Sequence, residues 1–261
     1  MTATKPVKAR SPAVPDLVAR DVEVQVDVGS VRLPGHLEIP SGATSIVIFV
    51  HGSGSSRHSP RNRYVAGVLN EAGLGTLLFD LLTPDEEADR ANVFDIGLLA
   101  SRLREVTAWL RGMPGTDDAR FGFFGASTGA AAALWAAAEP DADVAAVVSR
   151  GGRPDLAIPR LAAVRAPTLL IVGGRDVEVL ALNREAQAHL RCPSDLTIVP
   201  AATHLFEERG ALESVAAHAR QGWEASEYVD PESDWIESED GSYRSPDGTV
   251  RTRPLAGTEA L

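Results

Sequence analysis

The chain has little cysteine, little methionine and few aromatic side chains. Its single cysteine, Cys192, cannot form an intramolecular disulfide and stands outside any metal-ligand spacing. The absence of disulfides fits a reducing compartment. His51 and His58 are close in sequence but have no third ligand nearby, so no metal site is expected. We therefore expect a protein that works without a metal or another cofactor.

Long apolar runs are also missing from the chain. No segment approaches the roughly 20 consecutive apolar residues that a membrane-spanning helix needs. Residues 1–20 carry early positive charges, but no apolar run of signal-peptide length follows them. We therefore expect a soluble, cytoplasmic protein that does not act at a membrane.

The chain has no excess of basic charge. Its formal net charge is −11, and residues 223–261 account for −7 of it, with ten acidic side chains against three arginines. An acidic protein without a basic face is a poor candidate for nucleic-acid binding. The acidity belongs mainly to the C-terminal segment.

Hydrophobic residues make up 44% of the 261 residues, which is enough for one well-packed α/β domain. Residues 21–28 alternate strictly and predict a half-exposed strand, and residues 31–39 predict its antiparallel partner at a sheet edge. Pro34-Gly35 interrupts the second strand, where we expect a bulge or an edge feature. Strand and helix patterns then alternate, which predicts a doubly wound, mostly parallel sheet. The further strands are expected at 46–50, 74–82, 121–124, 144–149, 167–172 and 196–199, and the helices at 61–72, 94–111, 127–138, 177–190 and 211–221.

The pattern divides the chain into a loose leader at 1–20, an α/β domain at 21–222 and an acidic tail at 223–261. No connection within the domain is long enough for a large cap domain, so the pocket should be open and roofed only by the segments around 83–94 and 150–158. The tail is either disordered or packed on the domain, with a small hairpin around a Pro-Asp-Gly turn. Its candidate anchors are Trp223, Tyr228, Trp235 and Tyr243.

A Gly-x-Ser-x-Gly motif, GASTG at residues 125–129, lies between a predicted strand and an alanine-rich predicted helix. This spacing lets Ser127 occupy a sharp strand-to-helix turn, and the glycines allow the unusual backbone angles and the close approach of the two elements. A glycine-rich connection without chemistry is the alternative interpretation.

An acid and a histidine follow Ser127 in the chain, and each comes just after a predicted strand. Asp176 follows the strand at 167–172, and His204 follows the strand at 196–199. Sites in parallel sheets form beyond the carboxyl ends of the strands. A serine needs an imidazole to remove its proton, and the imidazole needs an acid to orient it. Asp176 could instead be the N-cap of the next helix, and Asp155 is a competing acid after the preceding strand.

A His-Gly turn, HGSG at residues 51–54, follows the strand at 46–50. The backbone N–H of Ser53, paired with that of Thr128, is expected to form an oxyanion hole. We interpret His51 as a buried residue that fixes this loop. A catalytic role for His51 is the less favoured alternative.

These motifs resemble the α/β-hydrolase superfamily and, within it, the dienelactone hydrolase-like group, over residues 21–221. The resemblance implies an eight-stranded sheet with its second strand antiparallel. It implies Ser127 as the nucleophile, Asp176 as the acid and His204 as the base. Enzymes that are true dienelactone hydrolases use cysteine as the nucleophile, so Ser127 favours ordinary ester or lactone cleavage.

Four arginines are candidates for binding an anionic group of the substrate, because they lie in loops expected at the same edge of the sheet. They are Arg57, Arg61, Arg150 and Arg153. An exposed, solvated loop is the alternative for the first two. The sequence as a whole predicts a serine hydrolase for a small ester or lactone, acting through an acyl-enzyme. The competing hypotheses are a non-catalytic scaffold that binds a protein partner through the acidic tail, and an acyltransferase.

Overall fold

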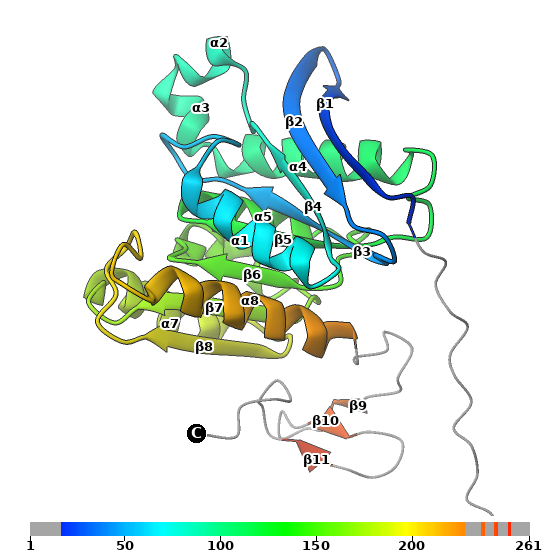
Figure 1. The fold of residues 1–261 in the computed structure, drawn as a ribbon. Helices are drawn as coiled ribbons and strands as arrows, with labels where there is room; N and C mark the ends of the chain where they lie inside the picture. The colour runs from blue at the N-terminus through cyan, green and yellow to red at the C-terminus, as the bar shows by residue number, and fades with distance from the viewer. Residues whose placement is uncertain (1–16, 228–235, 238–242, 245–249, 252–261) are drawn as a thin grey trace, which may run out of the picture.

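The computed structural model describes residues 17–227 and three short segments beyond them, at 236–237, 243–244 and 250–251. Eight strands form one sheet in the order β1-β2-β4-β3-β5-β6-β7-β8 (Figure 1). Within this sheet β2 runs antiparallel to both neighbours, and the pairs from β4 to β8 are parallel. This is the sheet that the resemblance implied. Its strands are β1 (Arg20–Val28), β2 (Val31–Ile39), β3 (Ser45–Val50), β4 (Gly75–Phe79), β5 (Arg120–Ala126), β6 (Val147–Arg150), β7 (Thr168–Gly173) and β8 (Ser194–Val199).

Helices cover both faces of the sheet. Two of them, α1 and α8, lie side by side on one face, whereas α4, α5 and α7 cover the other (Figure 1). The central strands β3 and β5 are almost wholly buried, as continuous apolar runs predict for strands covered on both sides. The helices are α1 (Pro60–Glu71), α2 (Pro84–Glu87), α3 (Arg90–Phe94), α4 (Ile96–Arg111), α5 (Thr128–Ala137), the 3-10 helix η1 (Pro154–Ala157), α6 (Ile158–Leu161), α7 (Val177–His189) and α8 (Ala211–Glu227).

The expected interruption of β2 at Pro34-Gly35 is wrong. The register with β1 runs without a bulge from Ile39 to Val31, and β2 lies inside the sheet, between β1 and β4. The carbonyl of Pro34 accepts a hydrogen bond from the N–H of Asp80, so the imide nitrogen faces the β4 side of the strand. Pairing with β4 begins only at Gly35. The missing N–H of the proline therefore removes no hydrogen bond to β1.

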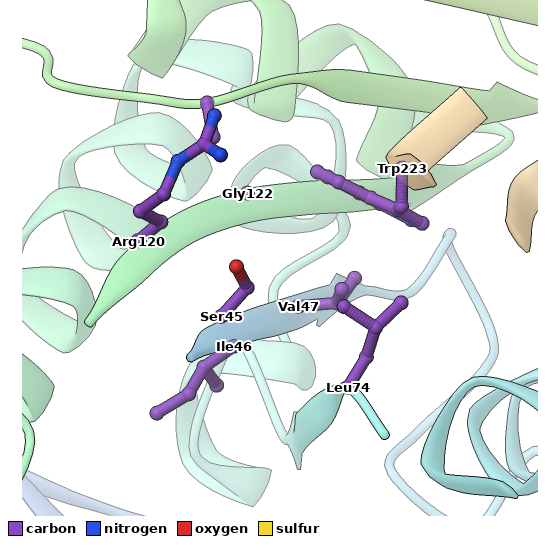
Figure 2. Close-up of a pocket in the computed structure, with 8 residues that line it drawn as sticks. Ser45, Ile46, Val47, Leu74, Arg120, Gly122 and Trp223 are labelled. Carbon is purple, nitrogen blue, oxygen red and sulfur yellow. The ribbon is translucent and has the colours of Figure 1, made fainter. Parts of the chain in front are cut away.

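Described structure extends beyond both ends of the domain expected at 21–222. Leu17, expected in the leader, is buried, and its N–H donates to the carbonyl of Ala43 at 2.8 Å. At the other end α8 continues past 222 to Glu227. Trp223, expected in the tail, lies against Gly122, where an added Cβ would meet the indole ring at 2.0 Å (Figure 2). The indole of Trp223 fills the space that a side chain at position 122 would need, so Trp223 packs against the domain.

Most of the tail lies outside the described residues, including the candidate anchors Tyr228 and Trp235. Three strands of two residues each are described, and they pair as β11-β10-β9. The antiparallel pair β10–β11 agrees with the hairpin that the Pro-Asp-Gly turn predicts. The strands are β9 (Ile236–Glu237), β10 (Tyr243–Arg244) and β11 (Val250–Arg251).

Candidate active site

Ser127 stands alone between the last residue of β5 and the first residue of α5, with φ at 51° and ψ at −123°. A positive φ is costly for a residue with a side chain and persists only where the surroundings enforce it. Here the enforcement is close packing. A Cβ at Gly129 would lie 2.1 Å from the carbonyl oxygen of Val50, and one at Gly125 would lie 2.4 Å from the Cα of Ala130. The turn therefore holds the Ser127 side chain, which is partly exposed, at the carboxyl edge of the sheet.

Asp176 and His204 are joined by a hydrogen bond. Nδ1 of the imidazole lies 2.7 Å from Oδ2 of the carboxylate, which is 15% exposed. Asp176 occupies the N-cap position of α7, but its side chain makes no cap hydrogen bond. The alternative of a simple helix cap therefore does not describe this carboxylate. With Nδ1 bound to the acid, Nε2 of His204 is left to accept a proton from another group.

The loop after β6 links the serine turn to the histidine. The N–H of Ser127 donates to the carbonyl of Arg150 at 3.3 Å, and the N–H of Arg153 donates to the carbonyl of Ser127 at 3.0 Å. A Cβ at Gly151 would lie 3.6 Å from Cε1 of His204. The three predicted triad residues thus share one edge of the sheet. Among the described residues, no hydrogen bond involves the hydroxyl of Ser127, and His204 is bonded to Asp176. A hydrogen bond between a nucleophile and its base often tightens only when substrate binds.

The loop after β3 passes directly over Ser127. A Cβ at Gly52 would lie 2.9 Å from the Cβ of Ser127, so only glycine fits there. The N–H of Ser53 donates to Oγ1 of Thr128 at 2.9 Å. The N–H of Thr128 belongs to the first turn of α5, where helical amides have no acceptor within the helix. The two expected oxyanion donors, the N–H groups of Ser53 and Thr128, thus belong to neighbouring residues. The N–H of Ser53 is hydrogen-bonded to the neutral hydroxyl of Thr128.

His51 fixes this loop, as expected. Its Nδ1 lies 3.0 Å from the carbonyl of Gly52, and its Nε2 lies 3.1 Å from the N–H of Leu81. The ring therefore donates from Nδ1 and accepts at Nε2, which is the neutral form. Burial lowers the pKa of His51, which keeps the ring neutral.

The four candidate arginines have different environments. Arg57 is bound to Asp80 by its backbone N–H and by its guanidinium, at 2.7 and 2.6 Å. Arg153 forms a two-fold contact with Asp155 at 2.9 and 2.8 Å. Asp155, the competing acid, is therefore paired with Arg153, and among the described hydrogen bonds the acid that binds His204 is Asp176. Arg61 has only a 3.4 Å contact with a carboxylate, and Arg150 has none among the described ion pairs.

Sequence reasoning missed a small hollow beside the oxyanion loop. It lies between this loop, the end of β4 and the segment of α2 and α3, and has room for about one water molecule. Its walls are mostly apolar. The lining includes Ser53, Thr128, Leu81, Leu82, Val93 and Leu99, with the carboxylate of Glu87 at the rim. The sequence analysis placed Leu81-Leu82 inside the strand expected at 74–82, whereas β4 ends at Phe79 and the pair follows Asp80 in the loop that lines the hollow.

The α2 segment over this hollow is held in place by two contacts. Thr83 and Glu86 form a reciprocal capping box at the start of α2. The carboxylate of Glu86 also binds Arg102 of α4 at 2.5 Å. These contacts lower the pKa of Glu86 despite its desolvation. The segment expected as a roof is thus tied to the helix beneath it.

A second hollow lies at the opposite end of the strands. It is formed where β3 and β5 begin and is lined by Ser45, Arg120 and Trp223, among others (Figure 2). It has no contact with the residues around Ser127. Among the described residues, no cluster of three or more His, Cys, Asp or Glu side chains could hold a metal ion. No described helix is both long enough and apolar enough to span a bilayer.

Comparison with known proteins adds independent information. The model of the dienelactone hydrolase family matches residues 65–229. A dienelactone hydrolase structure from Anabaena variabilis is 57% identical, covers 78% of this chain and 97% of its own, and superposes with a TM-score of 0.76. Est1E from Butyrivibrio proteoclasticus is 15% identical, with a TM-score of 0.68 over 78% of this chain and 98% of its own, and shows the fold alone.

A curated relative from Mycobacterium tuberculosis, named as a candidate phosphoribosyl transferase, is 64% identical over 204 residues. The match covers 78% of this chain but 46% of the relative, so the chain spans about half the length of the curated relatives it matches first. The family model covers more than half of the chain. The chain belongs to the dienelactone hydrolase family.

Proposed function

We propose that this chain is a serine hydrolase that cleaves a carboxylic ester or lactone through an acyl-enzyme. Ser127 is the nucleophile, His204 the general base and Asp176 the acid that orients it. The observation that carries the proposal is the 2.7 Å contact between Nδ1 of His204 and the carboxylate of Asp176, at the edge where the serine turn projects. The fold and the family support hydrolase chemistry in general.

In the first half of the reaction, Oγ of Ser127 attacks the carbonyl carbon of the ester while Nε2 of His204 takes the hydroxyl proton. The carboxylate of Asp176 stabilises the resulting imidazolium through Nδ1–H. The bond to the alcohol oxygen then breaks, and His204 gives its proton to that oxygen. In the second half, water attacks the acyl carbon while His204 takes one of its protons. The bond between the acyl carbon and Oγ of Ser127 then breaks, His204 returns the proton to Oγ, and the carboxylic acid leaves.

The negative oxygen of each tetrahedral intermediate is received by the backbone N–H groups of Thr128 and Ser53. The second donor is bound to the Thr128 hydroxyl at 2.9 Å before substrate arrives. A negatively charged oxygen is a stronger acceptor than a neutral hydroxyl, so the Ser53 N–H exchanges its partner as charge develops. One such donor is typically worth about 10²–10³ in rate.

A fluorophosphonate probe tests the proposal. We expect the folded wild-type protein to be labelled and to release acid from a panel of aryl esters, and Ser127→Ala to lose both properties. Ser101→Ala is the matched control, because Ser101 is an exposed serine on α4, away from the turn. Labelling that persists in Ser127→Ala overturns the assignment of the nucleophile.

Two further outcomes separate the competing functions. An absence of labelling in folded wild-type protein favours a non-catalytic scaffold. Labelling followed by transfer of the acyl group to an added alcohol in preference to water favours an acyltransferase. The phosphoribosyl transferase activity in the name of the longer relative supports neither alternative, because more than half of that relative lies outside the match.

A further inference from the structure

Asn183 is a fully buried amide side chain in the middle of α7. It is 0% exposed and shares the buried side of the helix with Val179, Leu180 and Ala186. Such a position normally holds an apolar residue, because a buried amide costs free energy unless its polar atoms are hydrogen-bonded. Oδ1 of Asn183 has no hydrogen-bond partner among the described residues. Packing alone therefore does not account for this residue.

The amide nitrogen of Asn183 contacts two backbone carbonyls that belong to different elements. Nδ2 donates to the carbonyl of Val179 at 2.8 Å, one turn earlier in the same helix. It also donates to the carbonyl of Gly152 at 3.0 Å, in the loop between β6 and η1. The first bond stays within α7, whereas the second crosses to a segment 31 positions earlier in the chain. Asn183 therefore fastens α7 to this loop.

The loop at 151–153 touches two of the three proposed catalytic residues. The N–H of Arg153 donates to the carbonyl of Ser127 at 3.0 Å. Gly151 has φ at 50°, and a Cβ there would lie 3.2 Å from the carbonyl oxygen of His204. Glycine adopts this left-handed conformation without the cost that a side chain would add, so the loop can pass close to the histidine. A displacement of the loop would therefore move the serine turn relative to the imidazole.

The third proposed catalytic residue, Asp176, stands at the start of the helix that carries Asn183. The two residues are seven positions apart, which is about two turns or roughly 10 Å along the axis, so they lie on about the same side of α7. A regular helix keeps this spacing fixed. The bond from Nδ2 of Asn183 to the carbonyl of Gly152 therefore links the element that holds the acid to the loop that holds the serine turn.

We propose that Asn183 is a positioning residue that sets the distance between the hydroxyl of Ser127 and the imidazole of His204. The proposal rests on the proposed function. Asn183 does not touch the reacting atoms and acts through the carbonyl of Gly152, while Asp176 holds the imidazole to α7. A misplacement of about 1 Å at the reacting atoms can cost about 10² in rate. One amide hydrogen bond can therefore change the rate far more than it changes the stability of the fold.

Gln187, one turn further along α7, offers a matched control. Its amide nitrogen also donates to a backbone carbonyl, that of Ser194 at 3.1 Å, at the start of β8 and away from the carboxyl edge. We expect Asn183→Leu to lower kcat on a neutral aryl ester by about tenfold to a hundredfold while KM changes little. Gln187→Met should leave both constants close to those of wild type. Equal kcat values in the two variants, or a change confined to KM, overturn the proposal.

The variant Asn183→Ser isolates the contact with the loop. A serine hydroxyl in a helix donates to the carbonyl four positions earlier, here that of Val179, but it is one bond shorter than the amide and does not reach Gly152. We expect Asn183→Ser to lose kcat as Asn183→Leu does, and it replaces Asn183→Leu if that protein fails to fold. A wild-type kcat in Asn183→Ser would show that the contact with Gly152 is not needed and would refute the positioning role.

Amide hydrogen exchange tests the link without catalysis. In Asn183→Leu the N–H groups of Ser127 and Arg153 should exchange faster than in wild type, because their hydrogen bonds join the serine turn to a loop that is no longer fastened to α7. In Gln187→Met they should exchange as in wild type. Equal exchange in the two variants refutes the link. A wild type that cleaves no ester contradicts the proposed function, and the exchange rates still decide whether Asn183 positions the loop.

Discussion

Asp176 begins α7, yet its carboxylate binds His204 and leaves the helix amides uncapped. Asp, like Ser and Asn, is a preferred N-cap because its side chain accepts from the first free amides of the helix. Giving up that contact for an imidazole is a local cost to the helix. The arrangement is understandable if the carboxylate is needed to orient the histidine.

We expect Asp176→Asn to lower kcat on a neutral aryl ester by about 10³–10⁴, because an amide stabilises the wrong tautomer of His204 and cannot stabilise its cation. Steady-state kinetics at neutral pH measure the effect. Asp155→Asn is the matched comparison, since that carboxylate binds Arg153, and it should lower kcat far less. A larger loss in Asp155→Asn than in Asp176→Asn would contradict the assignment of the acid.

At this scale the sequence predicted the strand-end positions of the candidate residues better than their surroundings. The strand-end positions of Ser127, Asp176 and His204 follow from periodicity alone, because each comes after an apolar run. Periodicity could not distinguish Asp176 from Asp155, since both follow strands. Periodicity also could not predict that Arg153 is paired with a carboxylate whereas Arg150 contacts an amide. It depends on Asp155 in one case and on Asn62, 88 positions away along the chain, in the other.

Helices α2 and α3 are the short elements that border the small hollow beside the oxyanion loop. The expected helix at 94–111 begins only at Ile96, because Asp95 caps it by accepting the N–H of Leu98. The preceding residues form the separate helices α2 and α3. Val93 of α3 and Leu82 before α2 then face the oxyanion loop. Two helix caps thus influence the size of the small hollow beside the oxyanion loop, which we propose as the place where the first atoms of the acyl group lie.

The acyl chain length of preferred substrates should follow from this hollow. We expect kcat/KM for 4-nitrophenyl esters to fall steeply from acetate to hexanoate, because a longer chain must displace the tied α2 segment. Val93→Ala enlarges the hollow by two methyl groups and should move the optimum to longer acyl groups. A rate series from two to eight carbons measures the shift. Tyr64→Ala, an exposed change on α1, is the control. A chain-length profile that is flat in wild type would contradict this role of the hollow.

In the molecule as a whole, helix α8 runs from the carboxyl ends of the strands toward their amino ends. It follows the His204 loop at the carboxyl edge, and Trp223 near its C-terminal end lies against Gly122 of β5 (Figure 2). Trp223 is 3% exposed and belongs to the same apolar cluster as Val215 and Ala219 of α8 and Leu69 of α1. This aromatic residue is therefore part of the domain core.

Two truncations should differ sharply in stability. A chain that ends at Glu227 should unfold in urea with a free energy close to that of the full chain. A chain that ends at Gly222 loses the buried indole and should be less stable by about 3–5 kcal/mol, the usual cost of removing a buried Trp. Equal stabilities of the two truncated chains would refute the anchoring role of Trp223.

The alternation of strands and helices predicted a mostly parallel, doubly wound sheet with an antiparallel hairpin at one edge, because each element carried its own periodic signal. The number of strands and the antiparallel second strand came from the resemblance, and the order of the strands was not predicted. The places where the prediction missed depend on partners that no local pattern reveals. The N–H of Leu17 donates to the carbonyl of Ala43, which ties this residue to the domain. Helix α8 extends beyond its predicted end at 221, and Gly122 leaves room for the indole of Trp223. The direction in which Pro34 faces likewise depends on where β4 begins to pair.

The position of Trp223 has a consequence for synthesis. The histidine loop lies between β8 and α8, and α8 is secured only when its final turn reaches β5. A nascent chain therefore holds its serine turn and its acid well before it can orient the imidazole. Under the proposed function, we expect ester cleavage by a ribosome-bound chain to begin only once nearly all of residues 17–227 have emerged.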